Sequence, residues 1–208
     1  MLDRAVEQKY RFDAGSGFYL SGQKKPTIST EEIDFGQVPP LLRALLVTDG
    51  TVTKFLEAYL WEPIRVEKLF QEDSPIEQDL PWLDLKAGDV VLKRRVILRG
   101  LFTNRVYTLA ESIVRVDRLW DGLREDLLSG RLGMGELLRD RRMETYREVL
   151  TVNRERGDQW AGPLELQAQT SVLRRHYRIF TQQRPTILIM EVFPEERFIE
   201  VMQEAHRR

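Results

Sequence analysis

The sequence TILIMEVF, residues 186–193, is the stretch that decides the fold. It is an apolar run of the length expected for a buried β-strand, and it carries one carboxylate, Glu191. Asp and Glu side chains are rarely fully buried unless a partner offsets their charge. Glu191 therefore lies either at an edge of the sheet that water reaches, or in a core strand that needs a carboxylate for chemistry.

The composition is that of an ordinary globular protein. A chain of 208 residues can bury one sizeable core, and 32 basic against 33 acidic side chains give a net charge of −1. This balance gives no electrostatic reason to expect a nucleic-acid partner. No apolar run is long enough for a membrane span, and the N-terminus lacks the apolar region of a signal peptide. We therefore expect a cytoplasmic protein without a membrane partner.

The chain has no cysteine and only two histidines, His176 and His206. Disulfides and thiolate chemistry are thereby excluded, and neither a Ser-His-Asp triad nor a multi-histidine metal site is expected. No glycine-rich phosphate-binding loop is present. If the chain is an enzyme, its reactive groups are carboxylates and arginines, and we expect no metal and no cofactor.

The hydrophobic pattern predicts one domain that follows an irregular arm. Residues 1–39, rich in Gly, Ser, Lys and Thr, form the predicted N-terminal arm, and residues 40–208 form the domain. Helical spacing is predicted at residues 39–50, 52–60, 119–130, 135–143 and 194–208. Strand-like alternation is predicted at residues 63–73, 89–100, 105–119, 144–155, 171–180 and 186–193. Runs of strands joined by short turns predict an α+β fold, in which helices pack on a single antiparallel β-sheet.

The segment VVLKRRVILRG, residues 90–100, predicts an inward-pointing arginine. Successive side chains of a strand point to opposite faces, and the even positions here are apolar except for Arg94. That face is therefore the core face. Arg94 either extends to the sheet edge, or pairs with a core carboxylate such as Glu191, or binds an anion at the bottom of a pocket.

The neighbouring segments predict a cavity beside these two residues. The even positions of residues 105–119 are small enough to line one. In residues 171–180, alternation places Arg175 and Tyr177 on one face and His176 on the other, with two further arginines. We interpret His176 as a structural histidine. An inward arginine and an inward glutamate around such a cavity fit a small anionic substrate and metal-free acid–base chemistry.

Five segments in their order and spacing resemble the chorismate pyruvate-lyase superfamily, namely LLVTDGTVTKFLE, VVLKRRVILRG, LAESIVRVDRL, RLGMGELL and RRHYRI…RPTILIMEVF. The most similar branch has archaeal, actinobacterial and cyanobacterial members, and the resemblance spans roughly residues 41–193. It implies a chorismate lyase-like antiparallel sheet with an internal ligand pocket. It also implies that the chain eliminates pyruvate from chorismate to give 4-hydroxybenzoate, a precursor of quinone-type compounds.

The resemblance also implies individual roles. The substrate-binding and catalytic arginine of the family falls on Arg94, and its catalytic glutamate falls on Glu191. Two further pocket positions of the family fall on Val52 and Leu132. Where the better-known members offer another arginine, this chain has the sequence LAES, so we assign the second anion contact to Arg175.

Two other functions stay open at this point. The same superfamily fold serves as the effector-binding domain of bacterial transcription regulators, which bind a small molecule without converting it. Those regulators carry a DNA-binding domain ahead of it, whereas the residues before the resemblance here show no helix-turn-helix pattern. The other alternative is a related lyase or isomerase for another enolpyruvyl acid. We favour the lyase, with chorismate and 4-hydroxybenzoate as its ligands.

Overall fold

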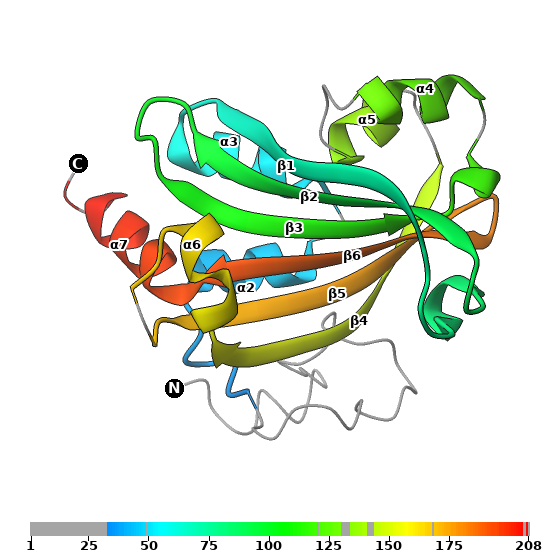
Figure 1. The fold of residues 1–208 in the computed structure, drawn as a ribbon. Helices are drawn as coiled ribbons and strands as arrows, with labels where there is room; N and C mark the ends of the chain where they lie inside the picture. Colours follow the sequence, from blue (N-terminus) through cyan, green and yellow to red (C-terminus); the bar gives the residue numbers. More distant parts are fainter. Residues whose placement is uncertain are drawn as a thin grey trace, which may run out of the picture.

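One six-stranded antiparallel sheet forms the framework of the protein in the computed structural model (Figure 1). The structure describes residues 33–48, 50–119, 121–129, 134–140, 144–167, 169–205 and 207. The strands are β1 (Ile64–Pro75), β2 (Val90–Gly100), β3 (Val106–Val114), β4 (Thr145–Arg156), β5 (Ser171–Thr181) and β6 (Arg184–Pro194). They lie side by side in the order β1-β2-β3-β6-β5-β4. The predicted α+β fold with a single antiparallel sheet is confirmed.

Helices cover both faces of this sheet, and Figure 1 shows α6 in front of it and α2 and α3 behind. The α-helices are α2 (Pro40–Val47), α3 (Val52–Leu60), α4 (Asp121–Ser129), α5 (Met134–Asp140), α6 (Ala161–Leu164) and α7 (Glu195–Ala205). The short 3-10 helices are η1 (Pro81–Leu83), η2 (Val116–Arg118) and η3 (Asp158–Trp160). The hydrophobic pattern did not predict α6 or the three 3-10 helices, because three or four residues are too few to show a helical period, and the strand predicted at residues 105–119 ends at Val114, before η2.

Two hydrophobic clusters lie on the face of the sheet that α2 and α3 cover. The first cluster joins α2, α3 and α7 to one end of the sheet, through residues such as Leu98 of β2 and Phe193 of β6. The second cluster joins α4 and α5 to the other end, through residues such as Leu92 of β2 and Ile187 of β6. The middle of each of these strands therefore lies between two cores, and Arg94 of β2 and Glu191 of β6 occur there.

A β-bulge decides which residues of the edge strand β4 face these helices. The pairing of β4 with β5 shifts just after Val149. Val149 pairs with Tyr177, whereas Val152 pairs with Arg175. Odd-numbered residues of β4 therefore face the helices before the bulge, and even-numbered residues face them after it. Arg147 consequently shares a face with Tyr177.

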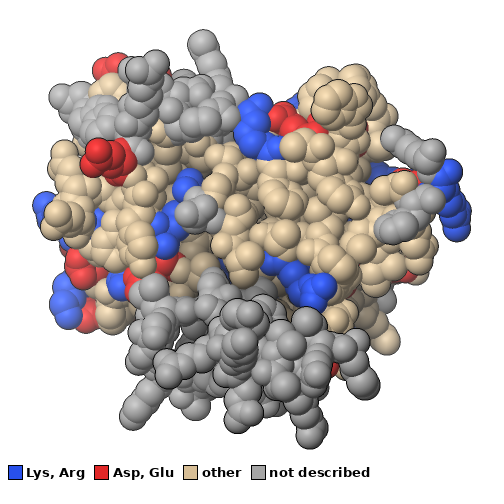
Figure 2. Space-filling model, turned by 180° about the vertical axis from the view of Figure 1, so that it is seen from behind, with Lys and Arg blue, Asp and Glu red and all other residues tan. Residues whose placement is uncertain are grey.

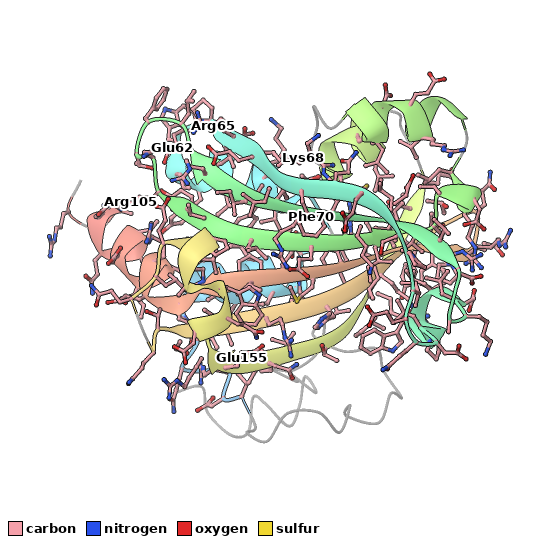
Figure 3. All side chains as sticks on the ribbon, in the orientation of Figure 1. Glu62, Arg65, Lys68, Phe70, Arg105 and Glu155 are labelled. Atoms are coloured by element: carbon pink, nitrogen blue, oxygen red, sulfur yellow. The ribbon has the colours of Figure 1, made fainter. Side chains whose placement is uncertain are left out.

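The hairpin that joins β2 to β3 is fixed at the end of the sheet by Glu62, which Figure 3 shows beside it. The Glu62 carboxylate accepts hydrogen bonds from the backbone N–H groups of Phe102 at 2.9 Å and Thr103 at 3.0 Å, and from the Thr103 hydroxyl at 2.8 Å. Arg105 of the same hairpin donates to both carboxylate oxygens of Glu204 in α7, at 2.9 and 2.7 Å. These contacts hold the strand that carries Arg94.

The predicted N-terminal arm lies mostly outside the described residues. Only residues 33–39 of it are described, and Val38 is buried in the first cluster against α2. The boundary between residues 39 and 40 stays a prediction.

Candidate active site

A cavity lies between the two hydrophobic clusters, on the face of the sheet that α2 and α3 cover. All six strands contribute to its lining, and the N-terminal ends of α3 and α5 complete it. Most of the lining is apolar. Among the described residues, the ionisable groups that line the cavity are Arg94, Arg147, Tyr177 and Glu191.

The ends of α3 and α5 meet at this cavity through a glycine. A Cβ atom on Gly135 of α5 would lie 2.8 Å from Cγ2 and 2.9 Å from Oγ1 of Thr51, which directly precedes α3. A larger residue at this position would require Thr51 or the end of a helix to shift. Val52, the first residue of α3, lines the cavity as the resemblance implied, and the positive end of the helix dipole favours anions there. The other predicted pocket residue, Leu132, lies outside the described residues.

Arg94 points into the cavity from the middle of β2, as the alternation predicted. It is 3% exposed, and in the sheet register it faces Ser112 of β3, whose side chain also lines the cavity. Burial lowers the pKa of Arg94 from its ordinary value, but an arginine stays protonated in proteins. The result is a buried positive charge at the wall of an apolar cavity, which favours an anionic ligand.

Glu191 reaches the same cavity from β6 and is 5% exposed. Its Oε2 accepts hydrogen bonds from Nε of Arg175 at 3.1 Å and Nη2 of Arg175 at 2.6 Å, and its Oε1 accepts one from the Tyr177 hydroxyl at 3.1 Å. Burial and the neighbouring charge of Glu191 raise the pKa of Tyr177, so the hydroxyl keeps its proton and donates. The ion-pair partner that the structure gives Glu191 is thus Arg175, whereas the sequence suggested Arg94.

Arg175 lies behind Glu191 and does not belong to the described cavity wall. It is 1% exposed, and its Nη1 donates to the carbonyl oxygens of Leu45 at 2.7 Å, Leu46 at 2.9 Å and Thr48 at 3.2 Å. These carbonyls end α2, where the helix itself supplies no donors. The predicted role of Arg175 as a direct anion contact is not supported by this placement, because its guanidinium is directed at Glu191 and α2.

Among the ionisable residues that line the described cavity, the sequence did not predict Tyr177 and Arg147 as site residues. The sequence alternation placed Tyr177 on the same face as Arg175. Its spacing of two residues from Arg175 was therefore the signal that could have identified it as a site residue. Arg147 gave no such signal, because the bulge in β4 reverses the alternation that surrounds it.

His176 lies on the opposite face of the sheet from the cavity. Its Nδ1 is 3.0 Å from the Thr151 hydroxyl, and its ring packs at a tilt against Trp82. Burial and the charge of Arg174 lower the pKa of His176 to about 4, so it is neutral at physiological pH. These contacts agree with a structural histidine.

The described residues also bear on metals and membranes. Within the ranges that the structure describes, no group of three or more His, Cys, Asp or Glu side chains is placed to hold a metal ion. None of the helices formed by those residues is long and apolar enough to cross a membrane. Figure 2 shows, on the rear face, separate small groups of Lys and Arg on the described surface.

A single antiparallel sheet with a cavity under its helices places the chain in the class of α+β domains with an internal pocket. Within this class, the chain belongs to the family described as Chorismate pyruvate-lyase Rv2949c-like, whose sequence model matches residues 46–199. The chorismate pyruvate-lyase of Mycobacterium leprae (strain TN) is 29% identical over 176 residues, which cover 80% of this chain and 79% of the relative. The protein of the same name from Mycobacterium tuberculosis is 24% identical over 164 residues, which cover 73% of this chain and 78% of the relative.

Solved structures share the fold at lower identity. PhnF from Mycobacterium smegmatis matches with a TM-score of 0.59 and 17% identity, over 73% of this chain and 66% of the PhnF chain. The effector domain of PhnF matches with a TM-score of 0.58 and 18% identity, over 71% of this chain and 90% of the domain. At these identities the likeness shows the fold alone.

Proposed function

We propose that this chain eliminates pyruvate from chorismate to give 4-hydroxybenzoate, with Arg94 and Glu191 as catalytic residues and without a metal ion or cofactor. The observation that carries the proposal is the meeting of these two almost fully buried, charged side chains at one apolar cavity. Membership of the chorismate pyruvate-lyase family supports the choice of substrate.

The reaction requires two anions to be held and one proton to be moved. Chorismate carries one carboxylate on its ring and another on the enolpyruvyl ether. When the bond from ring C3 to the ether oxygen breaks and the C4 proton leaves, the C4–H electrons form the double bond that completes the aromatic ring. The released enolpyruvate takes up a proton and becomes pyruvate. Because aromatisation drives the reaction, binding, orientation and proton transfer are sufficient tasks for the protein.

Each task falls to residues around the cavity. Arg94 binds the ring carboxylate through two parallel hydrogen bonds, the arrangement that a guanidinium makes best. Glu191 accepts the C4 proton and returns it to the departing enolpyruvate, while Arg175 and Tyr177 orient its two oxygens. Val52 packs against the ring from the end of α3. For Leu132, the pocket role remains a proposal from the resemblance.

The direct test is to incubate the purified protein with chorismate and to follow the products by chromatography. We expect 4-hydroxybenzoate and pyruvate in equal amounts, with no added metal and in the presence of a chelator. Loss of turnover on addition of the chelator would contradict the metal-free mechanism, and a different aromatic product would contradict the assigned reaction.

A second candidate function is non-catalytic binding of a small molecule. The observation that favours it is the match to the effector domain of PhnF, with a TM-score of 0.58. Binding of chorismate by the folded protein, with no product formed over hours, would favour this function over the lyase.

Replacing Arg94 by alanine should weaken chorismate binding far more than replacing its neighbour Arg95. Loss of charge-assisted hydrogen bonds in a buried site costs about 2–4 kcal/mol, roughly thirtyfold to a thousandfold in affinity. Arg95 is the matched control, because it points to the other face of the sheet and pairs with Glu111 at 2.5 Å. Isothermal calorimetry on both alanine variants measures the difference. Equal losses from the two substitutions would show that Arg94 is not the anion contact.

A further inference from the structure

Ser112 of β3 places a hydroxyl group at the wall of the cavity, in the middle of the sheet. The residue is 9% exposed, and Val96, Ala110 and Ile189 around it on the same wall are apolar. Within the ranges that the structure describes, its hydroxyl forms no hydrogen bond with another protein group. A polar group in such surroundings costs free energy unless a partner satisfies it, so this hydroxyl is available to a ligand.

The sheet register places Ser112 between Arg94 and Glu191. Ser112 pairs with Arg94 of β2 on one side and with Ile189 of β6 on the other. Glu191 lies two residues beyond Ile189, so it is a diagonal neighbour of Ser112 on the same face. Directly opposite residues have Cβ atoms about 4.5–5.5 Å apart, and diagonal neighbours are about 7–8 Å apart. A ligand that contacts both Arg94 and Glu191 therefore passes over Ser112.

The other hydroxyl-bearing residues of the described lining are placed differently. The Tyr177 hydroxyl donates to Glu191 at 3.1 Å. Thr51 and Thr53 lie at the start of α3 and not on the sheet. In the described part of the cavity wall, Ser112 is thus the residue that offers a hydroxyl group from the strands that carry Arg94 and Glu191, or from the strand between them.

The binding mode proposed for chorismate brings its ether oxygen to this position. Arg94 holds the carboxylate on ring C1, and Glu191 takes the proton from C4 at the opposite end of the ring. The ring edge that lies between these two contacts faces Ser112. One edge, C2 and C3, carries the ether oxygen, whereas the other edge, C5 and C6, carries only hydrogen. A hydroxyl donor on the wall finds an acceptor on the first edge alone.

We propose that the Ser112 hydroxyl donates a hydrogen bond to the ether oxygen of chorismate and stabilises the negative charge that develops there as the C3–O bond breaks. The inference rests on the proposed function and adds a catalytic residue to it. The electrons of the breaking bond move to the oxygen, and Glu191 delivers the C4 proton to the released enolpyruvate, so Ser112 keeps its own proton. A donor directed at developing charge lowers the barrier more than it strengthens substrate binding.

The test is Ser112→Ala, with Thr108→Val as the matched control. Thr108 lies on the same face of the same strand, is 0% exposed, and has a buried Oγ1 without a hydrogen-bond partner among the described residues, but it is not part of the described cavity wall. We expect Ser112→Ala to lower kcat for chorismate about tenfold to a hundredfold. Its affinity for 4-hydroxybenzoate should stay within about twofold of the wild type, because the product has no ether oxygen. Thr108→Val should turn over chorismate at the wild-type rate.

Ser112→Cys is the second variant, because it keeps the size of the side chain but donates only weakly, and its kcat should fall between those of the wild type and Ser112→Ala. An unchanged kcat in a folded Ser112→Ala would overturn the inference, as would an equal fall in Thr108→Val or a matching loss of 4-hydroxybenzoate affinity. With an active wild type, each of these results refutes the role of Ser112 alone. A wild type that forms no product from chorismate refutes the lyase and this inference together.

Discussion

Replacing Glu191 by glutamine is expected to slow turnover of chorismate by about a hundredfold to ten-thousandfold, the usual contribution of a general acid–base residue. Glutamine keeps the shape of the side chain and one acceptor oxygen, but it cannot take up a proton at useful pH. Because aromatisation drives the reaction, positioning by Arg94 retains part of the rate. Affinity for 4-hydroxybenzoate should change much less than turnover.

The structure makes stability the necessary control for this variant. Glu191 offsets the buried charge of Arg175, so Glu191→Gln also removes half of an ion pair. Melting temperature, 4-hydroxybenzoate affinity and turnover should therefore be measured side by side on the same preparations. Glu191→Asp, which keeps the charge on a shorter side chain, serves as the second variant if Glu191→Gln does not fold. Near-normal turnover in a folded Glu191→Gln would remove Glu191 from the mechanism and leave it a structural role.

Replacing Arg175 by alanine is expected to lower the free energy of unfolding by about 3–5 kcal/mol. The change leaves the Glu191 charge buried without its counter-ion, and it also removes the donor to three carbonyl oxygens at the end of α2. For a chain of this size, such a loss corresponds to a fall in melting temperature of roughly 6–20 °C.

Arg174→Ala is the matched control for Arg175→Ala. The two arginines are adjacent in β5, but Arg174 points to the opposite face and pairs with Glu155 in a partly exposed ion pair. Such pairs contribute about 0–1 kcal/mol, so its melting temperature should stay within a few degrees of the wild type. A stable, folded Arg175→Ala that loses chorismate binding would instead support the direct anion contact that the sequence suggested.

The alternation of apolar residues predicted much of the sheet and two of its key side chains. Arg94 interrupts a wholly apolar face of its strand, and Glu191 interrupts an apolar run, so both positions were visible without a structure. The structure places both at one cavity. Their catalytic roles stay predictions until the variants are measured.

The ion-pair partner of Glu191 could not be derived in the same way. Alternation gives the face of a strand but not the order of strands in the sheet. Arg175 and Glu191 are direct cross-strand neighbours because β5 and β6 form a hairpin, whereas β3 lies between β2 and β6. The carbonyl groups of α2 that bind Arg175 are 127 or more residues away in sequence, and only tertiary packing brings them together.

The position of Arg147 at the cavity could not be predicted for a different reason. Val152 packs in the cluster with α2 and α3, so a regular strand would place every odd-numbered residue of β4, Arg147 included, on the opposite face. The bulge after Val149 adds one residue and reverses this assignment for the first part of the strand. Nothing in the local sequence, such as a glycine, marks the bulge.

The contact between Gly135 and Thr51 brings the ends of α5 and α3 together at the wall of the cavity. The ends of α5 and α3 meet there so closely that a Cβ atom on residue 135 would lie 2.8 Å from Thr51. A side chain at residue 135 would press on Thr51, and if the helix ends moved apart to relieve this contact, the cavity would open further to water. Water raises the local dielectric constant and weakens every charge–charge interaction in the cavity. The absence of one methyl group at residue 135 therefore supports the strength with which Arg94 and Glu191 act on a ligand.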